Sequence, residues 1–241
     1  MVEQSPVVER VLTVTAHPDD VDFGYAGTVA SLVSDGVEVT YCVVTDGEAG
    51  GFDASVSRSQ MARTRREEQR AAAAAVGVHD VVFLGYPDGQ VEPTLNLRRD
   101  ITRVIRSVRP DRVLTQSPNR NLDRMFSSHP DHLACGEATL SAVYPDARNG
   151  FAFPELLAEG LEPHTAWQVW VGDPGGTRAV VDITDHIDKK INALMCHRSQ
   201  VERWDEEEFS GRIRTWAADT AAECDLPEGR FAESFRVLDT A

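Results

Sequence analysis

A histidine and two carboxylates stand together in the segment Ala16-His17-Pro18-Asp19-Asp20, directly after the apolar run at 11–15. The run predicts a buried strand, and open α/β sheets place their ligand chemistry at the carboxyl ends of such strands. An imidazole and a carboxylate at i and i+3, as in His17 and Asp20, can both ligate a metal such as zinc. Asp19 between them can act as a base. Alone, however, Pro-Asp is also an ordinary turn pair.

A second cluster, His129-Pro130-Asp131-His132, follows the strand predicted at 112–116 and a long loop at 117–128. Two histidines at i and i+3 near a helix start can face the same side. If both clusters lie at one sheet edge, His17, Asp20 and His132 can converge and leave a fourth metal position open, as in catalytic zinc sites. Asp19 would then take a proton from the metal-bound water. His129, if protonated, would stabilise the oxyanion and protonate the leaving group, which fits amide hydrolysis.

Other chemical signals in the sequence are weak. The remaining histidines, which have no partner spacing, are interpreted as surface or capping residues: His79, His164, His186 and His197. The glycine-rich loop at 47–51 matches neither the dinucleotide fingerprint nor the phosphate loop. The sequence also has no G-x-S-x-G nucleophile elbow. Nucleotide-dependent and serine-hydrolase chemistry are therefore disfavoured.

Strand-like and helical patterns alternate along the first half of the chain. The predicted strands are 11–17, 38–45, 81–85 and 112–116, and the predicted helices are 24–35, 59–76 and 95–108. This order predicts an α/β fold, a three-layer Rossmann-like arrangement with a mostly parallel sheet and helices on both faces.

The region 145–241 is less regular, within a chain expected to form a single domain over 1–241. A helix should begin near Pro130 and run toward Val143. Further strands are predicted at 166–171 and 178–183, and further helices at 185–198 and 206–223. The cluster Asp173-Pro174-Gly175-Gly176 predicts a hairpin turn between the two strands.

Charge and composition limit the partners. With 24 basic and 39 acidic residues the net charge is −15, which disfavours nucleic acid and membrane surfaces. The four cysteines show no C-x-x-C spacing, and no apolar segment reaches the roughly 20 residues that a membrane span requires. Because nothing resembles a secretion signal either, a reducing cytoplasm is the expected location.

The two histidine clusters, in this order, resemble those of the LmbE-like, or PIG-L, family of zinc-dependent N-acetylglucosaminyl deacetylases. The segment 65–72, leading to Gly77-Val78, resembles the arginine–glutamate helix of that family, and 85–89 resembles its next element. The similarity covers roughly residues 9 to 145. It implies a single deacetylase domain with the LmbE-like fold.

The resemblance also implies a role for each site residue. It makes His17, Asp20 and His132 the metal ligands, Asp19 the general base, and His129 the residue that stabilises the transition state. Arg65 matches an arginine that holds sugar hydroxyls, and Asp88 matches an acidic sugar contact. Without the family, Arg65 would be interpreted as a helix-surface ion pair with a neighbouring glutamate, and Asp88 as part of a Pro-Asp-Gly turn.

The expected cofactor is Zn²⁺, with Fe²⁺ as the alternative, because imidazole and carboxylate ligands suit both ions. The expected partner is a small amino-sugar substrate, and a homo-oligomer is compatible because family members often assemble. The chain departs from the family in two places. Val21 replaces a glutamate, and Ser127 stands where thiol-biosynthesis deacetylases can carry a tyrosine, which disfavours a mycothiol-type substrate. The polar loop at 119–126 either caps the pocket or is a mobile surface loop.

Three alternatives stay open at this point. The same centre could hydrolyse the amide of a thiol S-conjugate or of a natural-product intermediate. The protein could also bind metal and sugar without turnover, although binding alone needs neither Asp19 nor His129. A phosphoesterase is the third, but its usual two-metal site needs more carboxylate ligands than the motifs supply.

Overall fold

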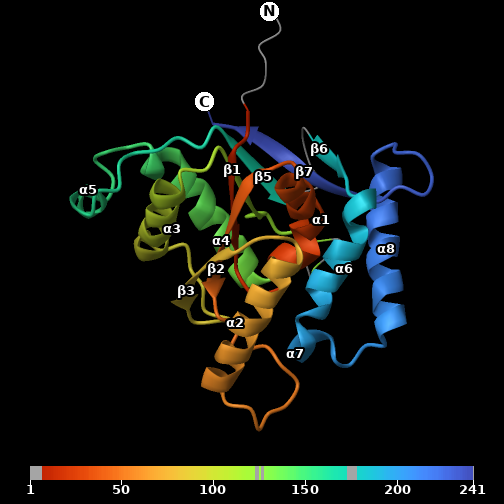
Figure 1. The fold of residues 1–241 in the computed structure, drawn as a ribbon. Helices are drawn as coiled ribbons and strands as arrows, with labels where there is room; N and C mark the ends of the chain where they lie inside the picture. Colours follow the sequence, from red (N-terminus) through yellow and green to blue (C-terminus); the bar gives the residue numbers. More distant parts are fainter. Residues whose placement is uncertain (1–6, 123–124, 126–127, 173–177, 241) are drawn as a thin grey trace, which may run out of the picture.

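The computed structural model describes residues 7–122, 125, 128–172 and 178–240, and it contains a seven-stranded sheet in the order β3-β2-β1-β4-β5-β7-β6 (Figure 1). The strands are β1 Arg10–Thr15, β2 Glu38–Thr45, β3 Asp80–Tyr86, β4 Arg112–Gln116, β5 Gln168–Gly172, β6 Arg178–Asp182 and β7 Ala232–Asp239. The strands from β3 to β5 pair in parallel, whereas β7 pairs antiparallel with both β5 and β6. The prediction of a mostly parallel sheet is confirmed.

The C-terminal strand β7 was not predicted from the sequence, and it changes the expected topology. Because β7 lies between β5 and β6, those two strands do not pair with each other as a hairpin. The turn expected at 173–176 lies outside the described residues.

The α-helices in the described residues are α1 Asp20–Ser34, α2 Arg58–Ala75, α3 Leu95–Val108, α4 Pro130–Ser141, α5 Pro154–Ala158, α6 Ile187–Met195, α7 Arg198–Val201 and α8 Glu206–Glu223. Side-chain caps start several of them: the Ser57 side chain accepts from Gln60 N–H, and the Thr94 side chain from Leu97 N–H. Two predicted bounds are wrong. The helix expected at 24–35 already begins at Asp20, and the one expected at 185–198 is divided into a short 3₁₀ turn, α6 and α7.

Helices cover both faces of the sheet, as predicted. On one face, Leu12 and Val14 of β1 pack in a buried cluster with side chains of α3 and α4. On the other face, Val11 packs with side chains of α1 and α2, and α8 adds a further layer over α6. Figure 1 shows α3 on the left of the molecule and α1, α6 and α8 on the right. Because successive side chains of β1 point to opposite faces of the sheet, this strand contributes to the core on each face.

The position of the two histidine clusters follows from the pairing of β1 with β4. These strands are adjacent and parallel, with Val14 opposite Thr115, so their carboxyl ends lie side by side. The segment 16–20 leaves β1 and enters α1, while the loop after β4 leads to α4 at Pro130. The sheet therefore brings the clusters to one edge, as the sequence predicts. Among the described residues, none of the helices combines the length and apolarity needed to cross a bilayer.

Candidate active site

The three side chains predicted as metal ligands converge at the carboxyl edge of the sheet. His17 Nδ1 lies 3.2 Å from His132 Nε2 and 3.3 Å from an Asp20 carboxylate oxygen. His132 Nε2 lies 3.0 Å from the other Asp20 oxygen. In a tetrahedral site with bonds of about 2.0–2.1 Å, neighbouring donor atoms stand about 3.3 Å apart. The two histidine nitrogens and the Asp20 carboxylate thus lie at the spacing of neighbouring metal ligands, with each nitrogen facing a different Asp20 oxygen.

The second ring nitrogen of His17 faces two other carboxylates. His17 Nε2 lies 3.1 Å from Asp88 Oδ1 and 3.2 Å from Asp131 Oδ2. Asp131 is itself held by the backbone N–H groups of Gly89 and Val91, at 2.7 and 3.2 Å. Histidines that bind metal usually give their other N–H to such a carboxylate, which orients the ring. The sequence reasoning did not assign Asp131, although it stands inside the second histidine cluster.

Negative charge gathers around His17. Burial lowers the pKa of His17, but Asp20, Asp131 and Asp88 together raise it to about 12. The negative electrostatic potential of these carboxylates favours a cation at this position. The donor atoms of His17, Asp88 and Asp131 are also close enough to hold one ion, as are those of the three histidines. The described residues thus contain a His/Asp group able to bind a metal.

His129 forms the N-cap of α4, and its Nδ1 accepts a hydrogen bond from the Asp131 backbone N–H at 3.2 Å. Its ring centre lies 4.9 Å from that of His17. Burial and the nearby His17 lower the pKa of His129. The structure therefore favours a neutral imidazole with its hydrogen on Nε2, rather than the protonated ring considered from the sequence.

Asp19 has an unusual backbone conformation and a buried partner. Its φ of 95° lies in the left-handed region. Arg65 Nη2 donates to the Asp19 carboxylate at 3.0 Å and also to the carbonyl of Pro18, while Arg65 Nη1 donates to the Gly47 carbonyl. Arg65 is 4% exposed, so a surface ion pair with a neighbouring glutamate is wrong. Burial raises the pKa of Asp19, Arg65 lowers it and Asp20 raises it, and the net direction is upward.

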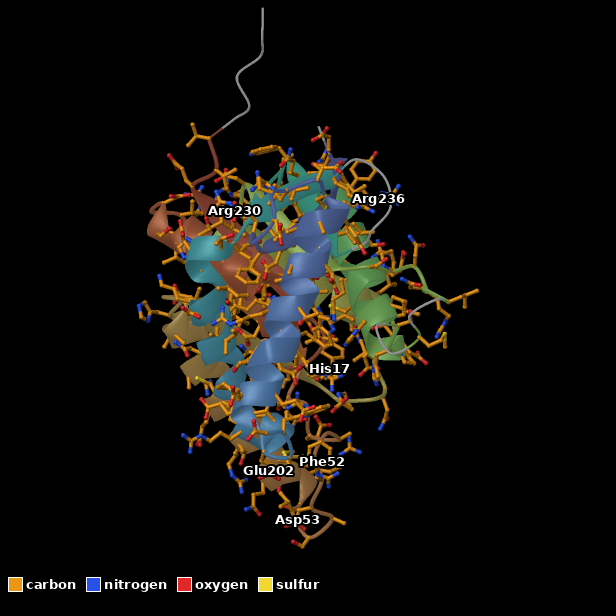
Figure 2. All side chains as sticks on the ribbon, turned by 90° about the vertical axis from the view of Figure 1, so that its right-hand side faces the viewer. His17, Phe52, Asp53, Glu202, Arg230 and Arg236 are labelled. Carbon is orange, nitrogen blue, oxygen red and sulfur yellow. The ribbon has the colours of Figure 1, made fainter. Side chains whose placement is uncertain are left out.

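These side chains surround a pocket of about 330 Å³. Its lining residues are His17, Asp19, Ala49, Gly50, Arg65, Asp88, Gly89, His129 and His132. Figure 2 shows His17 at mid-height on the face turned to the viewer, with the loop that carries Phe52 and Asp53 below it. A larger groove, of about 630 Å³, is lined by residues such as Arg10 and Glu38 at the starts of β1 and β2. It includes none of the predicted site residues, so the smaller pocket is the candidate active site.

The glycine-rich loop at 47–51 serves this pocket by allowing Arg65 to approach. A Cβ at Gly47 would lie 2.3 Å from Arg65 Nη1, and one at Gly50 would lie 2.6 Å from the same nitrogen. Ala49 N–H donates to Asp88 Oδ2, and Glu48 accepts from Asp88 N–H, so the loop is also tied to the segment after β3. The close approach of Arg65 therefore explains the glycines of this loop without a bound phosphate.

Sequence comparison shows the family of the chain. Residues 12–143, more than half of the chain, match the PIG-L family model, described as GlcNAc-PI de-N-acetylase, and the chain belongs to this family. It is 34% identical over 193 residues to a diacetylchitobiose deacetylase of Thermococcus kodakarensis, covering 80% of this chain and 70% of that protein. It is 31% identical to a probable N-acetyl-α-D-glucosaminyl L-malate deacetylase of Bacillus cereus, covering 80% of this chain and 84% of that protein.

Comparison with solved structures also finds a similar deacetylase. The N,N'-diacetylchitobiose deacetylase of Pyrococcus horikoshii superimposes with a TM-score of 0.86 at 30% sequence identity. The match covers 96% of this chain and 84% of that one. The similarity thus extends through the C-terminal region that lies beyond the family match, and the LmbE-like fold expected from the sequence is confirmed.

Proposed function

We propose that this protein is a metal-dependent N-deacetylase that removes the acetyl group from an N-acetylglucosaminyl compound. The observation that supports this most strongly is the convergence of His17 Nδ1, His132 Nε2 and the Asp20 carboxylate. The two nitrogens lie 3.2 Å apart, and each lies 3.0–3.3 Å from a different Asp20 oxygen. His17 and His132 line a pocket together with Asp19 and His129, which supply a carboxylate base and a neutral hydrogen-bond donor. The similar deacetylases support the choice of reaction and of substrate class.

The proposed metal ligands are His17 Nδ1, Asp20 and His132 Nε2, with Zn²⁺ or Fe²⁺ as the ion. An alternative set, His17 Nε2 with Asp88 and Asp131, is also close enough to hold one ion. We prefer the first set because it consists of the ligands that the family resemblance implies. Asp131 and Asp88 are then the carboxylates that orient His17. When bound, the ion would lower the pKa of its water and polarise the acyl oxygen.

In this proposal Asp19 takes the proton from the attacking water and returns it to the departing amine. The carboxylate lines the pocket next to Asp20 and is held by Arg65. The N–H at Nε2 of neutral His129 donates to the acyl oxygen as negative charge develops there. Because this donor carries no positive charge, the leaving-group proton comes from Asp19 rather than from His129.

Contacts to the sugar from Arg65 and Asp88 stay predictions. Both side chains line the pocket, which is consistent with substrate contact. In the structure, however, they are engaged with Pro18, Asp19 and Gly47, and with His17 and Ala49. A cytoplasmic location and a homo-oligomer likewise stay predictions, and Ser127 lies outside the described residues.

The proposal is tested by measuring amine release from a panel of N-acetylglucosaminyl compounds with metal-loaded protein. The panel should contain di-N-acetylchitobiose, the malate glycoside and the inositol glycoside, with a thiol S-conjugate amide as the competing substrate. We expect release from at least one amino-sugar compound. Turnover of the S-conjugate alone would favour the amidase alternative, and tight sugar binding without any turnover would favour a binding protein.

Replacing Gly47 by alanine should lower kcat by about tenfold or more, because the added Cβ displaces the guanidinium that holds Asp19. Gly36→Ala is the matched control, since Gly36 also has a positive φ (+85°, against +65° at Gly47) but no atom within 4 Å of the added Cβ. Both variants should lose about 1–2 kcal/mol of stability to backbone strain. Equal kcat values for the two variants would contradict the role given to the loop.

A further inference from the structure

The backbone of Asp19 is held from one side by two neighbouring turns of α2. Asp19 N–H donates to Gln69 Oε1 at 2.8 Å, and Arg65, one turn earlier, binds the Pro18 carbonyl and the Asp19 carboxylate. Gln69 is fully buried. A left-handed conformation costs a non-glycine residue roughly 1–2 kcal/mol. The hydrogen bond from Gln69 helps to maintain this conformation and thereby the direction of the carboxylate.

The orientation of Gln69 is set in turn by a buried carboxylate. Gln69 Nε2 donates to Asp22 Oδ2 at 2.8 Å, and Asp22 is fully buried. Because an ionised carboxylate only accepts hydrogen bonds, it fixes the amide nitrogen of Gln69 toward itself and leaves the amide oxygen for Asp19. Asp22 directly follows Val21, one of the two positions at which this chain departs from the family pattern.

The same oxygen of Asp22 is bound by His197, which comes from the corner between α6 and α7. His197 Nε2 lies 2.8 Å from Asp22 Oδ2, across a separation of 175 residues. His197 is fully buried, so its interpretation as a surface residue is wrong. It is the N-cap residue of α7, but its side chain makes no capping hydrogen bond. Ser199 beside it donates from both its backbone N–H and its hydroxyl to Glu68 of α2, at 2.7 Å each. The C-terminal region is thus docked onto the helix that carries Gln69.

We propose that Gln69, oriented by the Asp22–His197 pair, is a positioning residue for the base Asp19. This inference rests on the proposed function, because it assumes that Asp19 accepts the proton of the attacking water. It gives the region beyond residue 143 a part in catalysis, since His197 supports the geometry of a loop at the other end of the chain. A displacement of about 1 Å in a catalytic group can cost on the order of 10²-fold in rate.

The test compares Gln69→Leu with Gln60→Leu, a control on the exposed surface of the same helix. Gln69→Leu should reduce kcat by about 10- to 100-fold and leave KM and the bound metal per chain unchanged. In an Asp19→Asn background the same substitution should cause no further loss. Equal kcat for the two leucine variants would overturn the proposal. It would also be overturned if Gln69→Leu lowered kcat as much in the Asp19→Asn protein as in the wild type.

Two further variants separate positioning from a general loss of structure. Gln69→Glu, to be used if Gln69→Leu does not fold, keeps an acceptor for Asp19 N–H but cannot donate to Asp22, and should also reduce kcat. His197→Gln retains an N–H donor and should stay closer to wild-type kcat than His197→Leu. An equal loss of kcat in both variants would contradict the role given to the His197–Asp22 contact.

If the wild-type protein releases no amine, the proposed function fails and this inference fails with it. If Asp19→Asn is inactive but Gln69→Leu behaves like Gln60→Leu, the inference alone fails.

Discussion

Replacing Asp19 by asparagine is expected to reduce kcat by about 10²- to 10⁴-fold while the protein still binds its metal. The amide has nearly the shape of the carboxylate, but it cannot take a proton from water. Asparagine also tolerates the left-handed conformation found at this position, so the turn into α1 should survive. Its amide oxygen can still accept the hydrogen bond from Arg65. The substitution therefore removes basicity with little change in structure.

The measurement is steady-state amine release together with the metal content of the purified protein. Asp35→Asn, at the exposed far end of α1, is the matched control and should retain wild-type kcat. An Asp19→Asn variant with wild-type kcat would show that another group takes the proton. If the variant loses metal as well, Asp19 is a ligand and the proposed assignment of the donor atoms is wrong.

The second large effect is expected for His132→Ala, which removes one of the three converging donor atoms. His132 Nε2 lies 3.0–3.2 Å from Asp20 and from His17 Nδ1, so no neighbouring donor of the proposed set replaces it. Loss of an orienting residue around a metal ligand typically costs 10- to 100-fold in metal affinity, and loss of the ligand itself should exceed about 100-fold. Activity should fall with metal occupancy.

Metal affinity can be measured by competition with a chelator of known strength, followed by metal analysis. His79→Ala, at an exposed position outside the site, should bind metal like the wild type. Wild-type affinity in His132→Ala would contradict the ligand set. It would instead favour the group on the other side of His17, formed with Asp88 and Asp131.

Much of the site could be predicted because its parts are local in sequence. The first histidine cluster directly follows a strand with an apolar pattern, and the second follows another such strand after the loop at 117–128. Parallel strands bring their carboxyl ends to one edge. The pattern therefore places His17, Asp20 and His132 together before any coordinates are known. The parallel sheet follows from the alternation of strands and helices in the same way.

The parts that could not be predicted depend on contacts between distant residues. His197 has no motif around it, and its role appears only because α7 docks onto α2 and brings it to Asp22. β7 is defined by pairing with strands about 50 to 70 residues earlier, which no local pattern specifies. The hydrogen bond that His129 Nδ1 accepts and the lowered pKa of this ring likewise depend on a backbone N–H and on burial, neither of which is visible from residue spacing.

The central claim, that this pocket performs metal-dependent N-deacetylation, is tested most directly by titrating the metal-free protein with Zn²⁺ or Fe²⁺. Amine release from the best N-acetylglucosaminyl substrate is followed during the titration. The rate is predicted to start near zero, rise with added ion and level off at one ion per chain. Full activity in the metal-free protein, or one tightly bound ion per chain with no amine released from any amino-sugar substrate, would contradict the claim.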